Sequence, residues 1–146
     1  MAKSAASEAK AKLVVRHAQA GDVAAVQKLY KKVYPGMSPY SADQLRGQIN
    51  NFPQGQFVAT YEDAVVGYCA TFRIAEAIAF APHTWWQITG NGFASRHDPD
   101  GDWLYGMEVF VDPEFRGLRI GQRLYAARKA LATEQHLKGI VFGGRL

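Results

Sequence analysis

Apolar residues recur along the chain with two different periods, and these periods predict its helices and strands. Residues 1–12 are mostly Ala, Lys, Ser and Glu without an apolar period, which predicts a flexible leader before one domain over residues 13–146. A short apolar run from Leu13 predicts a strand. Segment 21–36 predicts a helix that Asp22 can cap, because its apolar residues recur at i, i+3, i+4 and i+7. These apolar positions are Val26, Leu29, Tyr30 and Val33.

The next segments predict a second helix and a hairpin. Ser41 followed by Gln44 has the capping-box pattern of a helix start, and Pro53 ends this helix. Two strand-like runs then meet at a turn formed by Glu62 and Asp63, which predicts an antiparallel hairpin. One face of its second strand carries apolar residues at period two, at Val66, Tyr68, Ala70, Phe72 and Ile74.

The second half of the chain predicts a strand, helix and strand unit after an irregular segment. Residues 76–102 mix aromatic residues with Gly, Asn, Pro and Asp, which predicts an excursion containing a short helix. An apolar strand follows at 102–111, then a helix at 120–136 and a strand at 139–146. Because a crossover helix joins parallel strands, the whole chain is expected to be an α/β domain with a mixed central sheet flanked by helices.

Composition limits the classes of protein that fit. The 146 residues are 48% apolar, which is enough for one core, and no apolar run suits a secretory signal or a membrane span. The single cysteine, Cys69, cannot form an internal disulfide, and the histidines have no ligand spacing, so no metal site is predicted. We expect a cytoplasmic protein.

The net charge of +4 is concentrated in the last part of the chain. Residues 112–146 hold seven basic and three acidic side chains. Such an excess suits a phosphorylated ligand or nucleic acid. No pattern of stacking aromatic residues accompanies it, so no nucleic-acid partner is predicted.

The junction "VDPEFRGLRIGQRLY" between strand and helix has the features of an anion site. The first amides of a helix have no partner within the helix, and the helix dipole favours a negative charge there. Gly117 and Gly121 leave these amides accessible, while Arg119 and Arg123 lie one turn apart and suit phosphate oxygens. The alternative is that the glycines ease a turn and the arginines form a solvated face.

The same residues resemble motif A of the GNAT superfamily of acyl-CoA-dependent N-acyltransferases, Gln/Arg-x-x-Gly-x-Gly/Ala. Arg116 and Gly121 take its first and last positions, and Arg119 stands where the middle glycine is usual. The order of elements also matches over nearly all of residues 13–146. The anion site is expected to tolerate Arg119 if this residue is right-handed helical.

This resemblance implies acetyl-CoA as co-substrate and acetyl transfer to an unidentified small-molecule or peptide amine. The pantetheine arm would enter a gap between the splayed strands at 102–111 and 139–146 and pair with the backbone of Val109, Phe110 and Val111. The diphosphate would bind at Arg116, Gly117, Arg119, Ile120, Gly121 and Gln122.

Glu108 is the candidate catalytic base, because a carboxylate within an apolar strand needs a partner or a task. The alternative is a strand edge that faces solvent or pairs with an arginine. Many relatives place a tyrosine acid on a helix beyond the last strand seen here. That role is not transferred to Tyr125, for which core or cofactor-edge packing is expected.

More narrowly, residues 113–146 resemble the acetyltransferase-like domain fused to carbon–nitrogen hydrolases in some bacterial proteins. We therefore expect a fragment of a longer chain, or a homodimer that covers the last strand. The alternative function is a non-catalytic acyl-CoA-binding module that regulates a fused or associated carbon–nitrogen hydrolase. The acceptor is expected to be selected by residues 76–102.

Overall fold

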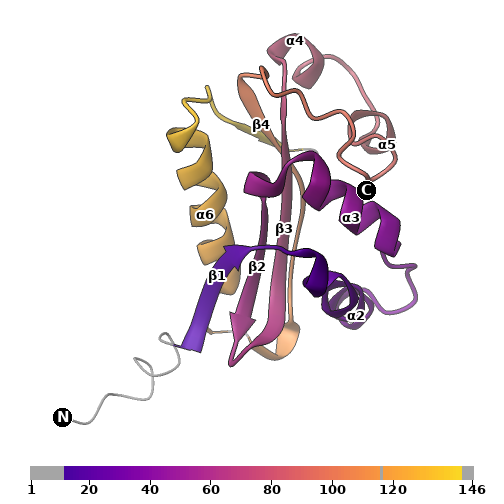
Figure 1. Ribbon diagram of the computed structural model, residues 1–146, viewed down its shortest axis with the longest axis vertical. Helices are drawn as coiled ribbons and strands as arrows, with labels where there is room; N and C mark the ends of the chain where they lie inside the picture. Colours follow the sequence, from indigo (N-terminus) through magenta and orange to yellow (C-terminus); the bar gives the residue numbers. More distant parts are fainter. Residues whose placement is uncertain (1–11, 116, 143–146) are drawn as a thin grey trace, which may run out of the picture.

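A computed structural model describes residues 12–115 and 117–142, which form a five-stranded sheet between helices (Figure 1). The strands are adjacent in chain order, and all neighbours are antiparallel except β4 and β5, which are parallel. The predicted mixed sheet with a parallel final pair is therefore confirmed. The strands are β1 (Leu13–His17), β2 (Gln56–Tyr61), β3 (Ala64–Ile74), β4 (Trp103–Val111) and β5 (Ile140–Phe142).

Helices cover both faces of the sheet. In Figure 1 helix α6 lies on one side, with α2 and α3 on the other. Adjacent residues of β3 confirm this, because Tyr68 bonds to Gln48 of α3 while Gly67 packs against Ile120 and Leu124 of α6. The helices are α2 (Val23–Val33), α3 (Ala42–Asn51), α4 (Glu76–Ala79), α5 (Trp85–Ile88) and α6 (Ile120–Glu134), with 3₁₀ turns at η1 (Ala20–Asp22), η2 (Pro53–Gly55) and η3 (Pro113–Phe115).

Strand β3 runs through the centre of the core. Its predicted apolar face is buried, and the Tyr68 hydroxyl on that face donates to Gln48 Oε1 at 2.5 Å. On the other face, a Cβ at Gly67 would lie 2.9 Å from Ile120 Cγ2. The glycine therefore lets the start of α6 approach the sheet.

Helix α3 holds the irregular segment through three side-chain amides spaced one turn apart. Each donates to one of three successive carbonyls, at 2.7 to 3.0 Å. The pairs are Gln44 with Asn91, Gln48 with Gly92, and Asn51 with Phe93. Gly47, within the helix, gives room for Phe93, whose Cδ1 would lie 2.8 Å from a Cβ there. The excursion is thus a fixed part of the fold, with two short helices in it.

The predicted helix and turn signals are confirmed with one correction. Ser41 and Gln44 form the capping box, and Glu62 and Asp63 form the hairpin turn with positive φ. Asp22, however, does not cap α2 through its side chain. Its carboxylate accepts two bonds from Arg16 at 2.8 Å, which lower the pKa of Asp22.

Two predicted terminal segments fall largely outside the described residues. Of the leader, only Lys12 is described, and its ammonium lies 2.8 Å from a carboxylate oxygen of Glu62. Of the last predicted strand, residues 140–142 are confirmed as β5, and residues 143–146 lie outside the described part of the chain.

Candidate functional site

A β-bulge in β4 marks the centre of the candidate site. Ala70 of β3 pairs with Glu108, whereas the next residue pairs with Gly106, so Met107 is the extra residue. A bulge bends its strand and increases the local twist. The bulge is fixed from outside the sheet, because the indole N–H of Trp85 donates to the Met107 carbonyl at 3.1 Å.

The described pairing of β4 with β5 stops just before the bulge. The two strands pair only from Leu104 to Gly106 on β4 and from Ile140 to Phe142 on β5. Within the described residues, the remainder of β4 therefore has no strand partner on that edge. Residues 143–146, which would continue β5, lie outside the described part of the chain, so the splayed strands expected from the sequence stay a prediction.

The backbone groups at the free edge come from alternate residues of β4. The Asp112 amide donates to Val66 of β3, so the alternation of the antiparallel ladder directs the amides of Val109 and Val111 to the opposite edge. Phe110 differs, because the same alternation directs its backbone groups toward β3, where it pairs with Tyr68. The amides of Val109 and Val111 thus have no strand partner on this edge within the described residues.

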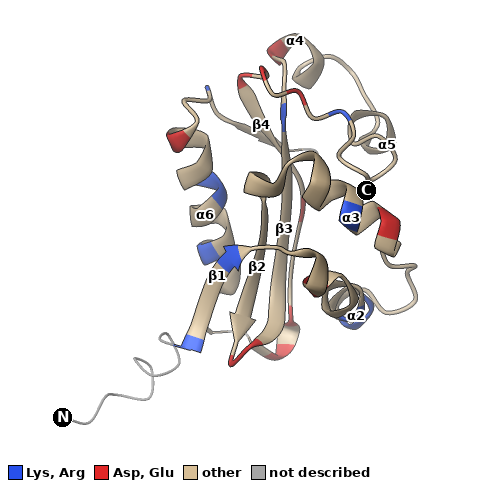
Figure 2. Cartoon of the chain, viewed as in Figure 1, with Lys and Arg blue, Asp and Glu red and all other residues tan. Residues whose placement is uncertain are grey.

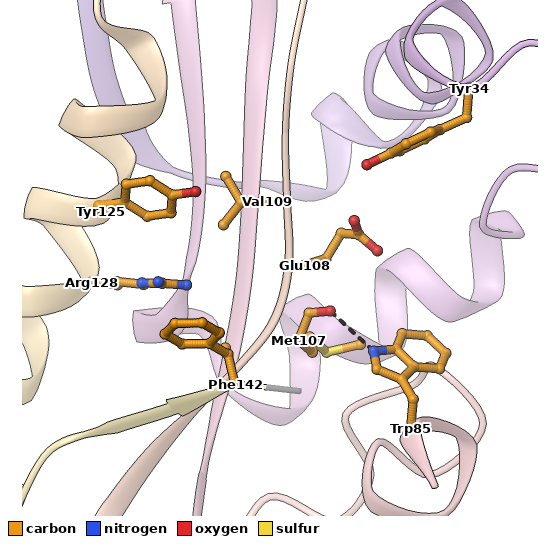
Figure 3. A pocket seen from close by; sticks show the side chains of 9 residues that line it. Tyr34, Trp85, Met107, Glu108, Val109, Tyr125, Arg128 and Phe142 are labelled. Atoms are coloured by element: carbon orange, nitrogen blue, oxygen red, sulfur yellow. Dashed lines mark hydrogen bonds between the residues drawn. The ribbon is translucent and has the colours of Figure 1, made fainter. Parts of the chain in front are cut away.

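A cleft of about 570 Å³ lies over this edge (Figure 3). Figure 3 shows Tyr125 and Arg128 of α6, with Phe142 of β5, on one side of the strand, and Glu108 with Tyr34 and Trp85 on the other. Tyr125 lies at the cleft rather than in the core, since its side chain is about half exposed. The lining residues are Tyr34, Trp85, Gly106, Met107, Glu108, Val109, Tyr125, Arg128 and Phe142.

Glu108 is buried and lines the cleft, so it is not a solvent-facing strand edge. Only 9% of the residue is exposed, and the Tyr40 hydroxyl donates to its Oε2 at 2.6 Å. Tyr40 is held in turn by Gln27, whose side-chain amide donates to the Tyr40 carbonyl. The carboxylate therefore has a fixed position beside the bulge.

Arg119 does not have the right-handed conformation that was the condition for its tolerance in the anion site. It is the N-cap residue of α6 and adopts the left-handed conformation, with φ 56° and ψ 39°. This conformation favours glycine, which is usual at the middle position of the motif. Arg119 thus adopts a backbone conformation that is typical of glycine. Its side chain is exposed.

The first amides of α6 have no partner within the helix. The first backbone bond of the helix runs from Arg123 to Arg119, so the amides of Ile120, Gly121 and Gln122 precede the hydrogen-bond ladder. A Cβ at Gly121 would meet only Val111 Cγ2, at 3.9 Å. At Gly117, where φ is +93°, a Cβ would have nothing within 4 Å. No described side chain blocks this helix end; Arg116 lies outside the described residues.

The predicted pair of phosphate-binding arginines is not formed. The Arg123 guanidinium donates to the Leu13 carbonyl at 2.8 Å and joins α6 to β1. It therefore has a structural contact, although the side chains of both Arg123 and Arg119 are exposed. Figure 2 shows the basic residues distributed along α6.

The loop before α6 is anchored by an ion pair that sequence reasoning missed. Asp112 accepts the Glu114 amide through Oδ1 and the Lys32 ammonium through Oδ2, at 2.9 and 2.8 Å. Lys32 also bonds to the Glu114 carboxylate, and these bonds raise the pKa of Lys32. An aspartate directly after a strand and before Pro113 is a turn signal, but nothing in the sequence points to a lysine of α2 as its partner.

The described residues contain neither a metal-binding cluster nor a membrane-spanning helix. They contain no cluster of three or more His, Cys, Asp or Glu side chains that could hold a metal ion. None of the described helices has the length and apolar character needed to cross a membrane.

Comparison with known proteins gives two curated relatives from Bacillus subtilis (strain 168). The probable hydrolase YhcX is 40% identical over 135 residues, which are 92% of this chain and 26% of YhcX. The uncharacterized N-acetyltransferase YkwB is 29% identical over 138 residues, which are 92% of this chain and 61% of YkwB. The chain thus spans less than two thirds of either relative.

Solved structures share the fold. The GphF GNAT-like decarboxylase in complex with isobutyryl-CoA is 29% identical with a TM-score of 0.68, over 80% of this chain and 57% of that one. The loading GNATL domain of CurA from Lyngbya majuscula is 22% identical with a TM-score of 0.68, over 82% and 57%. A Brucella melitensis GNAT acetyltransferase in complex with acetyl-CoA is 15% identical with a TM-score of 0.58, over 92% and 77%.

A sequence profile described as the Acetyltransferase (GNAT) family matches residues 23–143. The matched region includes the bulged β4, the cleft beside it and the open start of α6. The chain belongs to the GNAT acetyltransferase family.

Proposed function

We propose that the protein is an acyl-CoA-dependent N-acyltransferase that transfers an acyl group, acetyl in the simplest case, to an amine. The observation that carries this proposal is the open N-terminus of α6 beside the free edge of β4. Family membership and the acetyl-CoA bound to the Brucella melitensis relative support it.

In this proposal acyl-CoA lies along the junction from α6 to the bulge. The diphosphate binds at Gly117 and at the amides of residues 119–122, with Arg116 as a further predicted contact. The pantetheine arm pairs with Val109 and Val111, so that the thioester approaches Met107 and Glu108. Accessible helix amides and an exposed Arg119 suit a diphosphate, since both favour negative charge.

The proposed reaction is direct attack of a neutral amine on the thioester carbonyl. The new C–N bond forms, the C–S bond breaks, and the coenzyme leaves as a thiolate that takes up a proton. Glu108 accepts the proton of the amine, and a strand amide stabilises the oxyanion. Cys69 is unsuited to carry the acyl group, because it is fully buried and burial raises its pKa to about 12.

The surroundings of Glu108 suit a cationic amine. Tyr34 and Trp85 line the same cleft, and the Tyr40 ring is tilted against that of Trp85, with 6.2 Å between the ring centroids. Trp86 is 55% exposed and lines a smaller pocket next to Tyr40. Aromatic faces near a carboxylate attract ammonium groups, which would hold the amine before it loses its proton.

A second candidate is a non-catalytic acyl-CoA-binding module of a hydrolase. The observation that favours it is the match to 26% of YhcX, a relative described as a probable hydrolase. In this role the chain binds the coenzyme ester, but no amine accelerates thiol release.

Calorimetry and thiol release distinguish the candidates. Titration with acetyl-CoA, CoA and ADP shows whether the protein recognises the coenzyme ester or binds any ligand that carries a diphosphate. Release of free thiol with a panel of amines then measures transfer. We expect acetyl-CoA binding and amine-dependent release; binding without release would favour the second candidate, and absence of binding would contradict both.

A further inference from the structure

Arg128 is a charged residue of the cleft whose partner has not been assigned. Its guanidinium carbon lies 4.6 Å from the Tyr125 ring centroid and 5.3 Å from that of Phe142. Over residues 12–115 and 117–142, Arg128 has neither a side-chain hydrogen bond nor an ion pair, and it is half-buried. A guanidinium removed in part from water requires an anionic or polar partner.

The floor of the cleft is adapted to this side chain. A Cβ at Gly106 would lie 2.7 Å from Arg128 Nη1 and 3.5 Å from Phe142 Cβ. Glycine at 106 therefore lets the guanidinium lie against β4. The two aromatic rings limit its orientation, so its donors remain directed into the cleft (Figure 3).

Arg128 lies where the described pairing of β4 with β5 ends. Gly106 and Phe142 form the last described pair of β4 with β5. In the proposed function, an arm that starts at α6 and follows Val111 and Val109 is directed to this end, roughly 16 Å along the strand. The group that reaches Arg128 is then the distal end of the acyl chain.

The acceptor lies on the other side of the strand. Glu108 and its aromatic neighbours face away from Arg128 across β4 (Figure 3). Arg128 therefore contacts the donor rather than the attacking amine. We propose that Arg128 binds the carboxylate of a dicarboxylic acyl-CoA, such as malonyl-CoA or succinyl-CoA, and so selects the acyl donor.

This inference rests on the proposed function but adds no new chemistry to it. The C–N bond forms and the C–S bond breaks as above, and the distal carboxylate is unchanged. A bidentate, charge-assisted pair in a half-buried cleft is expected to improve binding by about tenfold or more.

Calorimetry with succinyl-CoA, malonyl-CoA, acetyl-CoA and CoA tests the inference in the wild type and in Arg128→Gln. We expect the wild type to bind a dicarboxylic ester at least about tenfold more tightly than acetyl-CoA. Arg128→Gln should lose this preference and keep its affinity for acetyl-CoA within about twofold. Lys129→Gln is the matched control, since it removes one exposed charge from the same helix and should keep the preference.

Gly106→Ala is a second variant, which keeps Arg128 in the sequence but displaces its guanidinium with the new Cβ. It should also lose the preference for dicarboxylic esters. Equal wild-type affinity for acetyl-CoA and both dicarboxylic esters would overturn the inference while leaving the proposed function intact. The inference would also be overturned if Arg128→Gln changed only the KM of a carboxylate-bearing acceptor and left the binding of every acyl-CoA ester unchanged. Failure of every ester to bind would instead contradict the proposed function.

Discussion

The Tyr40 hydroxyl donates a hydrogen bond to Glu108 Oε2 at 2.6 Å, joining residues 68 positions apart. Tyr40 lies just before α3, and Glu108 lies beside the bulge of β4. The bond holds the carboxylate at the cleft. It connects the helical layer that covers the sheet to the residue proposed as the base.

Glu108→Gln is expected to lower kcat/KM by about 100-fold or more, because an amide cannot take the proton of the attacking amine. Thiol release with saturating amine measures this. The affinity for acetyl-CoA should change by less than about threefold, since Glu108 contacts the acceptor side. Glu134→Gln is the control, an exposed carboxylate on α6 outside the cleft. Full activity in Glu108→Gln would remove this residue from the mechanism.

Tyr40→Phe removes the hydroxyl that positions Glu108. We expect kcat to fall by about tenfold, with the coenzyme affinity unchanged, because the carboxylate loses one charge-assisted bond. Steady-state kinetics with varied amine separates kcat from KM. A control for loss of a buried hydroxyl is Tyr68→Phe, which breaks the bond to Gln48 and should lower stability. A kcat equal to that of the wild type would show that the bond has no catalytic part.

Arg119→Gly is expected to be at least as stable as the wild type, whereas Arg119→Val should lose about 1–2 kcal/mol in the free energy of unfolding. The reason is the left-handed conformation at 119, which glycine adopts freely and a β-branched residue resists. Urea unfolding of the three proteins measures the difference. Similar stability of the glycine and valine variants would contradict the left-handed assignment.

His97 is expected to make the protein less stable as the pH falls below about 6.5. Its ring stacks on Phe52, and Nδ1 accepts the Arg73 amide at 2.9 Å. Burial, followed by the charge of Arg73, lowers the pKa of His97. The unfolded chain then binds the proton more readily, so stability is complete above the unfolded pKa and decreases as pH falls through the folded pKa.

The measurement for His97 is the melting temperature between pH 8 and pH 5. The wild type should lose more stability over this range than His97→Phe, which has no titrating ring at this position. Equal losses would mean that the ring does not titrate differently in the folded protein. His17→Phe is the control, because it removes another histidine that also stacks on a phenylalanine, Phe57, at the edge of the sheet.

The sequence predicted the elements whose signals are local. The capping box at Ser41 and the hairpin turn at Glu62 depend on neighbours within a few residues, and both are present. The parallel pairing of β4 and β5 follows from the crossover helix between them. The first amides of α6 were also predictable, since every helix has them.

The rest depends on contacts between distant residues. Nothing local shows that Arg123 bonds to the Leu13 carbonyl, or that Arg128 lies over Gly106. The anion site was expected to tolerate Arg119 if this residue were right-handed, whereas Arg119 is left-handed, a conformation that its side chain disfavours. The irregular segment has no period of its own because side chains of α3 hold its backbone.

The central claim is that the diphosphate of acyl-CoA binds the open amides at the start of α6, and Gly121→Ala tests it most directly. A Cβ at this position meets only Val111, at 3.9 Å, so the unliganded protein should fold normally and gain up to about 1 kcal/mol from helix propensity. Gly21→Ala, at another glycine with open space, is the control. Calorimetry should show acetyl-CoA binding weakened about tenfold or more in Gly121→Ala, with an unchanged or higher melting temperature and an unaffected control. Wild-type affinity in Gly121→Ala would contradict the account.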